Sequence, residues 1–238
     1  MQRISTSFLQ ALPAPSPFFL LAALLSAALT LGEASQAAAE GRWAKAMAGF
    51  AAQDASDPYP QGGVVFVGSS SVRLWDLAAG FPDVAPTPLN RGFGGSTIPD
   101  AIEHFDLLIK KHQPRCVVFY SGDNDIAAGH KAERVAADFE TFAAKLRKEL
   151  PECRLIVMPP KPSPSRWKRV EVYREASAAI EAHCQSTPNC EFVDVWPAMT
   201  DDDGLPLPEI FRNDKLHMNE QGYALWNELL GPHIAPRE

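Results

Sequence analysis

Three uninterrupted apolar runs constrain the fold of this chain most strongly. They are Gly63-Val64-Val65-Phe66-Val67, Cys116-Val117-Val118-Phe119-Tyr120 and Leu155-Ile156-Val157-Met158. Runs without alternation of polar and apolar residues are typical of strands that are buried on both faces, as in a parallel sheet. Glu191-Phe192-Val193-Asp194-Val195 predicts a fourth strand with more alternation, and Pro88-Leu89-Asn90 predicts a minor fifth.

Helical patterns separate these runs. The apolar spacing predicts helices at residues 42–52, 98–111, 132–150, 170–183 and 220–230. Strands that alternate with helices indicate βαβ units around a mostly parallel sheet that is covered on both sides. Because no internal repeat and no long linker interrupts the pattern, we expect residues 40–238 to form a single α/β domain of the open-sheet type.

The first 39 residues differ in character from the rest. Residues 18–31 are an uncharged apolar run of 14, preceded by Arg3 and followed by the small residues of 34–39. This arrangement is typical of a secretory signal peptide, and the run is shorter than the ~20 residues that a membrane-spanning helix needs. We therefore predict that residues 1–39 are a cleaved signal peptide, with an uncleaved N-terminal anchor as the alternative. The domain would then be exported, either to the periplasm or out of the cell.

Charge and cysteine content limit the partners of the domain. The chain has 22 basic and 29 acidic side chains and a pI near 5.4, which argues against nucleic acid or an anionic membrane as the main partner.

The pairing of the four cysteines is a separate question, because they can form disulfides in an oxidising compartment. Cys184 and Cys190 flank a short turn and are one candidate bridge. Cys116 and Cys153 each open a predicted strand and could meet across the sheet, and four free thiols are the alternative.

Ligand sites of open α/β sheets lie beyond the carboxyl ends of the strands. A serine hydroxyl placed there becomes a nucleophile when a base takes its proton and a third group holds that base. Asp214 and His217 lie three residues apart, so the carboxylate can hold Nδ1 of the imidazole and leave Nε2 to face a serine. Backbone N–H groups of a glycine-rich turn and an Asn amide can bind the oxyanion that forms during acyl transfer.

Four short blocks, three after predicted strands and one in the C-terminal segment, resemble, in order, those of the SGNH (GDSL-type) hydrolases. They are Val67-Gly68-Ser69-Ser70-Ser71, Gly94-Gly95, Gly122-Asp123-Asn124 and Asp214-x-x-His217. The resemblance covers residues 63–238 and implies a flavodoxin-like three-layer α/β/α sandwich with a mostly parallel five-stranded sheet. It also implies ester hydrolysis through an acyl-serine intermediate. By position, Ser70 is then the nucleophile, Asp214 and His217 are the acid and base, and the oxyanion-hole donors are Ser70, Gly95 and Asn124.

The nucleophile block departs from the family at one position, because Ser69 stands where the family usually has Asp. The block is therefore a run of three serines, and Ser69 and Ser71 are alternatives to Ser70 as nucleophile. Ser70 keeps the family position relative to Gly68. Ser71 could instead cap the helix that follows.

Two further features resemble a bacterial branch of the same family whose substrate range is poorly defined. One is the pair Arg73 and Trp75 after the three serines, and the other is the later segment 161–167, Lys-Pro-Ser-Pro-Ser-Arg-Trp. The resemblance to this branch therefore implies the type of reaction but not the substrate. Arg73 could pair with Asp76 or with the loop around Asp123.

Other polar residues are interpreted as structural. Four histidines are expected to be surface or packed residues, while His130 could line the site; Trp75, Trp167 and Trp196 are expected to pack in the core or at the rim. Asp123 and Asp125 are expected to be turn and cap residues and not a pair of metal ligands. The turn at Asp201-Asp202-Asp203-Gly204 lacks calcium-loop spacing, and no dinucleotide or phosphate fingerprint is complete. We therefore expect neither a metal ion nor a cofactor.

The sequence thus predicts an exported serine esterase that hydrolyses small acyl esters, such as acetyl groups on carbohydrate. Its partner would be a small-molecule or carbohydrate ester substrate, with no nucleic acid and, after signal removal, no membrane span. The alternatives are a lysophospholipase or thioesterase, an acyltransferase that uses the same residues, and a non-catalytic binding module on the same fold. The oligomeric state stays open.

Overall fold

The computed structural model describes residues 41–235. The predicted signal peptide, residues 1–39, lies outside the described residues. Within the described residues, 46–235 form one compact unit. Among residues 41–235, no helix combines the length and apolarity that crossing a membrane requires.

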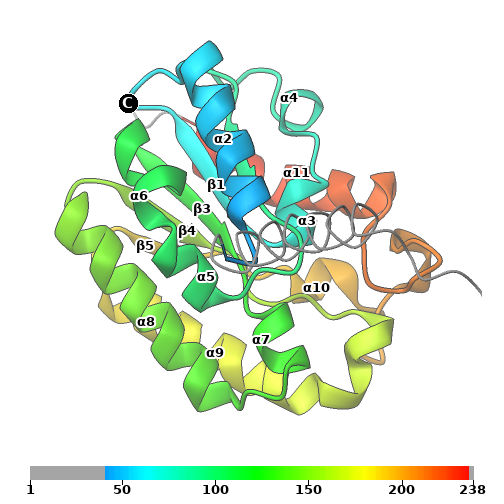
Figure 1. Ribbon diagram of the computed structural model, residues 1–238. Helices are drawn as coiled ribbons and strands as arrows, with labels where there is room; N and C mark the ends of the chain where they lie inside the picture. Colours follow the sequence, from blue (N-terminus) through cyan, green and yellow to red (C-terminus); the bar gives the residue numbers. More distant parts are fainter. Residues whose placement is uncertain (1–40, 236–238) are drawn as a thin grey trace, which may run out of the picture. The chain divides into compact units, whose positions relative to one another are not determined.

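A five-stranded, entirely parallel sheet forms the centre of the compact unit (Figure 1). The strand order is β2-β1-β3-β4-β5, the flavodoxin-like order. All five predicted strands are present, and their bounds differ from the prediction by at most a few residues. They are β1 (Val64–Gly68), β2 (Leu89–Gly92), β3 (Cys116–Tyr120), β4 (Arg154–Val157) and β5 (Cys190–Phe192).

Helices connect the strands as expected, with one correction. The predicted helix 98–111 is broken into α5 (Ile98–Glu103), α6 (Phe105–Leu108) and the 3-10 turn η1 (Lys110–His112). The buried positions at Ile98, Ala101, Phe105 and Leu108 keep helical spacing across the break, so the apolar pattern predicts one continuous helix. The other helical segments are α2 (Ala44–Ser56), α3 (Ser70–Arg73), α4 (Leu77–Gly80), α7 (Asp123–Ala127), α8 (Ala132–Glu149), η2 (Pro164–Arg169), α9 (Val170–Ser186), α10 (Trp196–Met199), η3 (Pro208–Ile210) and α11 (Glu220–Ile234).

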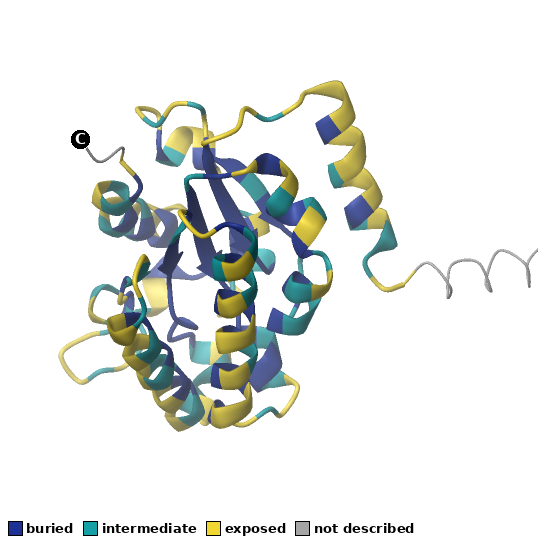
Figure 2. Cartoon of the chain, turned by 90° about the vertical axis from the view of Figure 1, so that its left-hand side faces the viewer, coloured by how far each residue is buried: buried dark blue, intermediate teal, exposed yellow. Residues whose placement is uncertain are grey.

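Helices cover both faces of the sheet. On one face, Val118 and Phe66 lie in a core with Trp75 and Trp226, to which α3, α4, α10 and α11 contribute. On the other face, Phe119 stacks on Phe142 of α8, with ring centroids 4.0 Å apart, and α8 packs against α5 and α9. Figure 2 shows the buried strands between helices whose outer sides are exposed. The expected three-layer α/β/α sandwich is therefore confirmed.

The four cysteines behave in two ways. Cys184 and Cys190 form a disulfide that joins the end of α9 to β5. Cys116, at the start of β3, and Cys153, just before β4, are both buried free thiols. The first candidate bridge is thus present, and the second pair of cysteines is reduced.

Candidate active site

The carboxyl ends of β1 and β3 lie side by side and hold two of the predicted blocks. Gly68 ends β1 and pairs with Tyr120, the last residue of β3. A Cβ atom on Gly68 would lie only 2.0 Å from the Tyr120 carbonyl oxygen, so this close approach requires glycine. Ser70 begins α3 two residues later and therefore stands, half-buried, at the carboxyl end of the sheet.

Ser70, His217 and Asp214 form one hydrogen-bonded chain. His217 Nε2 lies 2.9 Å from Ser70 Oγ, and His217 Nδ1 lies 2.6 Å from Asp214 Oδ2. Because an ionised carboxylate can only accept, Nδ1 carries the hydrogen that it donates to Asp214. Nε2 is then the nitrogen that can accept the serine proton. The structure thus brings these three predicted residues together.

Backbone hydrogen bonds hold the loop that carries Asp214 and His217. Asp214 Oδ1 accepts from the N–H groups of Leu216 and His217, both at 2.9 Å. The carbonyl of Lys215 accepts from the N–H of Ser165 at 3.0 Å. Partial burial raises the pKa of Asp214, but the hydrogen bonds from the His217 ring and from the two backbone N–H groups outweigh it and lower the pKa to about 2. Asp214 is therefore ionised at neutral pH.

The Gly-Gly and Asn blocks converge on the nucleophile block. Asn124 Nδ2 donates to the carbonyl of Ser96 at 2.9 Å, and the Ser96 hydroxyl donates to the carbonyl of Gly68 at 3.3 Å. Gly95 has a φ of 86° and Gly122 a φ of 111°, conformations that favour glycine. Gly122 turns the chain from β3 into α7, which carries Asn124. Hydrogen bonds through Ser96 therefore tie the Gly95 turn and Asn124 of α7 to the end of β1.

The neighbouring serines differ from Ser70 in exposure and partners. Ser69 and Ser71 are both buried, each 2% exposed. Ser69 occupies the N-cap position of α3 but makes no side-chain capping bond. The predicted capping role of Ser71 is wrong, because Ser71 lies inside α3 and its hydroxyl accepts from the Lys161 ammonium at 3.1 Å. Ser70 is the serine of the three whose hydroxyl contacts His217.

A buried charged cluster, which sequence patterns did not predict, lies next to these blocks. Lys161 is 1% exposed, and its Nζ lies 3.1 Å from Ser71 Oγ, 3.2 Å from the Tyr120 hydroxyl and 3.4 Å from Asp123 Oδ2. The Tyr120 hydroxyl also donates to Asp123. Asp123 is thus a buried ion-pair partner and more than a turn residue. The signal was a lysine between prolines, Pro160-Lys161-Pro162, soon after a buried strand.

Arg73 makes neither of the pairings considered for it. Asp76 accepts a backbone N–H and caps α4, and Asp123 belongs to the buried cluster just described. The Nε atom of Arg73 instead lies 2.9 Å from the position that a Cβ atom on Gly94 would occupy. The guanidinium of Arg73 therefore lies against the Gly-Gly turn, and a side chain at Gly94 would displace it.

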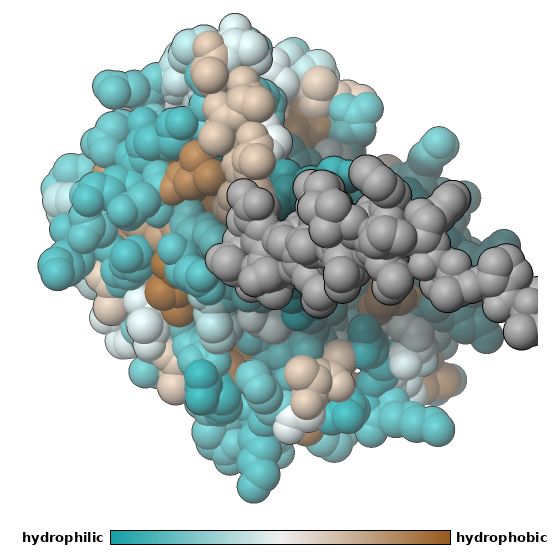
Figure 3. Space-filling model, in the orientation of Figure 1, coloured by the Kyte–Doolittle hydropathy of each residue, from teal (hydrophilic) through white to brown (hydrophobic). Residues whose placement is uncertain are grey.

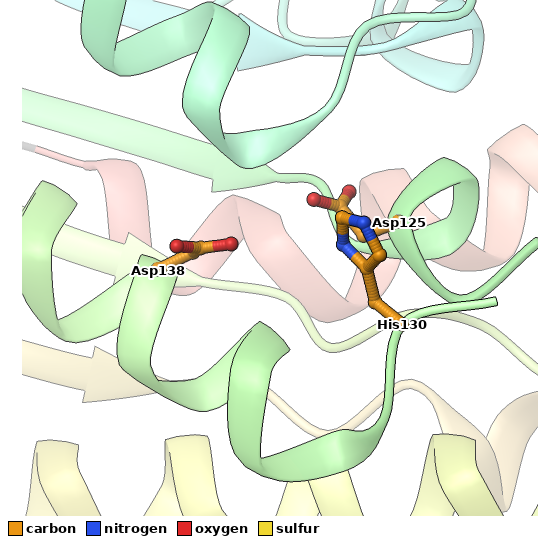
Figure 4. Close-up of side chains that lie close together, drawn as sticks. All are labelled: Asp125, His130 and Asp138. Atoms are coloured by element: carbon orange, nitrogen blue, oxygen red, sulfur yellow. The ribbon is translucent and has the colours of Figure 1, made fainter. Parts of the chain in front are cut away.

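One group of side chains has the composition of a metal site. Figure 4 shows Asp125 and His130 side by side, with the carboxylate of Asp138 directed toward them; their potential ligand atoms lie within 4.8 Å of one another. Asp125 accepts from the backbone N–H of Ile98 at 3.2 Å, and Asp138 accepts from Arg134 at 2.7 Å. Both carboxylates thus have protein donors, and Asp125 caps the start of α5. His130, considered above as a residue lining the site, faces this cluster.

The remaining histidines and tryptophans have contacts elsewhere in the described part of the chain. Trp75 is a core residue, as expected, whereas Trp167 and Trp196 are half-buried with ring centroids 6.3 Å apart. The histidine contacts are His104 with Phe93, His112 with Asp54, His183 with Phe139 and His233 with Glu191.

An open cleft of about 610 Å³ runs along the edge strand β2. Residues of α2, α4 and β2 line it together with Arg73. Its lining residues do not include Ser70, His217 or Asn124, so the cleft is separate from the hydrogen-bonded chain described above.

Comparisons with known proteins agree with the fold. The pattern of the GDSL-like lipase/acylhydrolase family matches residues 67–225. A Streptococcus pneumonia protein provisionally described as a platelet activating factor is 18% identical, with a TM-score of 0.72 over 88% of this chain and 99% of its own. A GDSL-like lipase from Bacteroides thetaiotaomicron is 21% identical, with a TM-score of 0.64 over 79% and 96% of the two chains. An acetylxylan esterase from Geobacillus stearothermophilus is 15% identical, with a TM-score of 0.60 over 75% and 96%. The curated proteins contain no match.

Proposed function

This chain belongs to the GDSL-like lipase/acylhydrolase family and is a serine hydrolase, and we propose that it is an exported esterase that removes small acyl groups through Ser70. The observation that carries the proposal is the hydrogen-bonded chain from Asp214 through His217 to Ser70. A serine joined in this way to an imidazole, which is itself held by a carboxylate, is the arrangement that activates a hydroxyl for attack on an ester.

The proposed reaction has two halves. Ser70 Oγ attacks the ester carbonyl carbon while His217 Nε2 takes the hydroxyl proton, and the tetrahedral intermediate collapses as Nε2 returns that proton to the leaving alcohol. Water then attacks the acyl-serine with His217 again as base, which releases the carboxylic acid and restores Ser70. Asp214 stays ionised throughout and stabilises the imidazolium that forms in each half.

Three donors would share the developing oxyanion: the N–H groups of Ser70 and Gly95 and the side-chain amide of Asn124. The amide nitrogen of Asn124 has two hydrogens, and the bond to the Ser96 carbonyl uses one of them. That bond orients the amide plane before substrate arrives, so the second hydrogen needs no reorganisation during the reaction. Preorganised donors of this kind supply a large share of the rate enhancement in acyl transfer.

Several observations favour a small acyl group over a long lipid chain. Leu205 is the one large apolar side chain that is exposed among residues 41–235, and the face in Figure 3 is mostly hydrophilic outside the part that grey atoms cover. One structural neighbour is described as an acetylxylan esterase. Carbohydrate acetyl esters are therefore the proposed substrate class.

Export is supported by the apolar segment 18–31, which has the length of a signal-peptide core. It is also supported by the disulfide between Cys184 and Cys190, since disulfides persist mainly in oxidising compartments. Periplasmic or secreted protein should therefore carry the activity and should begin near residue 40.

The first experiment is labelling of the purified protein with a fluorophosphonate, followed by peptide mass spectrometry. We expect an adduct on Ser70 that is absent in Ser70→Ala. An adduct on Ser69 or Ser71 would assign the reaction to a different serine, and the absence of an adduct on folded protein would favour the binding module.

A series of p-nitrophenyl esters from acetate to palmitate then tests the acyl group. We expect kcat/KM to be highest for acetate and to fall with chain length. A steady rise toward palmitate would contradict the proposal and favour a lipase-like activity. Addition of a sugar acceptor, with a search for acylated sugar, separates hydrolysis from acyl transfer.

A further inference from the structure

Lys161 is a fully buried lysine close to the candidate active site. Its side chain is 1% exposed, and the partner carboxylate of Asp123 is 5% exposed. A buried ion pair carries a desolvation penalty of several kcal/mol per ion, so replacement by apolar residues is often neutral or stabilising. The free energy of unfolding therefore does not by itself account for an ion pair at this position.

Two of the three partners of Lys161 belong to the blocks that hold the proposed nucleophile and the proposed oxyanion asparagine. Ser71 directly follows the proposed nucleophile, and Asp123 directly precedes the proposed oxyanion donor Asn124. The third partner, Tyr120, is the last residue of β3. One ammonium group with three hydrogens thus joins the end of the first block to the start of the third.

Donors and acceptors in the cluster follow one order: Lys161 donates to the Tyr120 hydroxyl, which donates to Asp123. The Tyr120 hydroxyl donates to Asp123, and burial together with the nearby Asp123 charge raises the pKa of Tyr120 well above its usual value, so the hydroxyl stays protonated. Asp123 Oδ1 is buried without a hydrogen-bond partner. Without Lys161, the Asp123 carboxylate would keep its bond to Tyr120 but would lose its balancing charge.

We propose that Lys161 is a positioning residue that sets the separation between the Ser70 hydroxyl and the Asn124 amide by holding Ser71 and Asp123 at once. This inference deepens the proposed esterase function and rests on it. Oxyanion donors must lie about 2.7–3.1 Å from the position of the developing charge. A displacement of about 1 Å can cost 10²-fold in rate. Loss of the link should therefore lower kcat and leave ground-state binding almost unchanged.

The test compares Lys161→Met with wild type and with Lys168→Met, an exposed lysine of η2 that serves as the control. With p-nitrophenyl acetate, we expect kcat of Lys161→Met to fall by about 10- to 100-fold, KM to stay within about threefold, and fluorophosphonate labelling of Ser70 to slow in parallel. The control should match wild type. A purely structural role would lower the melting temperature and leave kcat per folded molecule unchanged.

Two further variants test the positioning role if Lys161→Met does not fold. The double variant Lys161→Met and Asp123→Asn leaves no charge in this cluster. Ser71→Ala removes the hydrogen bond from Lys161 to the first block and keeps the ion pair with Asp123. We expect both to fold and to show a lower kcat. If either has wild-type kcat, the positioning role is wrong while the esterase stands. If wild-type protein neither hydrolyses esters nor reacts with the fluorophosphonate, the proposed function fails and the inference fails with it.

Discussion

His217 Nε2 lies 2.9 Å from Ser70 Oγ although 147 residues separate them in sequence. Two other long-range hydrogen bonds support this contact. The Tyr223 hydroxyl of α11 donates to the carbonyl of Ser71 at 2.9 Å, and Ser165 donates to the carbonyl of Lys215. The segments that carry Ser70 and His217 are therefore each held by a residue distant in sequence, and the final helix supports the site through Tyr223.

Asn124→Ala should lower kcat about 10²- to 10³-fold, because one oxyanion donor is lost. KM should change little, since the donor acts mainly on the transition state. Asn124→Asp is the matched variant: it keeps the shape, removes the donor and places a charge near the oxyanion, so it should be at least as slow. Steady-state kinetics with p-nitrophenyl acetate measure both. Wild-type kcat in either variant would remove Asn124 from the oxyanion hole.

Asp214→Asn should lower kcat on the order of 10³- to 10⁴-fold, because an amide does not hold the His217 tautomer. Since the pKa of Asp214 is about 2, its protonation contributes nothing to the pH dependence of the wild-type enzyme above about pH 4. The exposed Asp202→Asn is the control and should keep full activity. If kcat of Asp214→Asn lies within tenfold of wild type, Asp214 is not the residue that orients His217.

Asp125→Asn should stabilise the protein at alkaline pH. Burial raises the pKa of Asp125 from 3.8 to about 6, so the native state binds a proton there at pH values where the unfolded state has lost it. Stability from this group is therefore lost as pH rises from about 4 through 6. An amide can still accept from Ile98 and carries no buried charge, so we expect a gain of about 1–3 kcal/mol at pH 8.

Urea unfolding of both proteins at pH 8 and pH 4 checks this expectation. The difference in unfolding free energy between Asp125→Asn and wild type should shrink at pH 4. An equal difference at both pH values would show that the Asp125 carboxyl has an ordinary pKa. The exposed Glu140→Gln is the control and should give no pH-dependent gain.

Two glycine-to-alanine changes should have opposite effects. Gly68→Ala places a Cβ atom 2.0 Å from the Tyr120 carbonyl oxygen, and the backbone of both strands must shift, so we expect a loss of about 3 kcal/mol or more. Gly49 lies in α2 with no atom within 4 Å of an added Cβ. Gly49→Ala should therefore stabilise by about 0.5–1 kcal/mol. Thermal unfolding of both variants measures the contrast, and equal melting temperatures would contradict it.

Loss of the Cys184–Cys190 disulfide should cost about 2–3 kcal/mol, the loop-closure value for a six-residue separation. The double variant Cys184→Ser and Cys190→Ser should melt at the same temperature with and without reductant, and wild type should approach that temperature once reduced. If reductant has no effect on wild type, the two cysteines do not form a bridge in solution.

The fold was predictable because its strands are buried on both faces. A continuous apolar run such as Cys116–Tyr120, in a chain where helices alternate with strands, fits a parallel sheet covered on both sides. The strand-end rule then directs attention to Ser70 and Asn124. The contact between Asp214 and His217 was predictable for a local reason, since the two residues are three apart and interact within one turn.

The buried cluster was not predictable in the same way. Lys161 contacts Ser71 across 90 residues and Asp123 across 38, and no periodic pattern records such pairings. Arg73 is a second example, because Asp76 nearby in sequence suggests an ion pair, whereas the guanidinium lies against Gly94 of a different turn. Packing of this kind is determined by tertiary geometry, which local sequence does not encode.

The brace from Tyr223 to Ser71 has a consequence for the protein while it is being made. A ribosome completes all five strands, and with them the Ser70 and Asn124 blocks, before it reaches Asp214, His217 and Tyr223. A chain that ends before Asp214 would therefore contain the whole sheet and Ser70 but neither His217 nor the Tyr223 brace. The proposed esterase activity should thus be absent from any product of incomplete translation that lacks α11 and the loop before it.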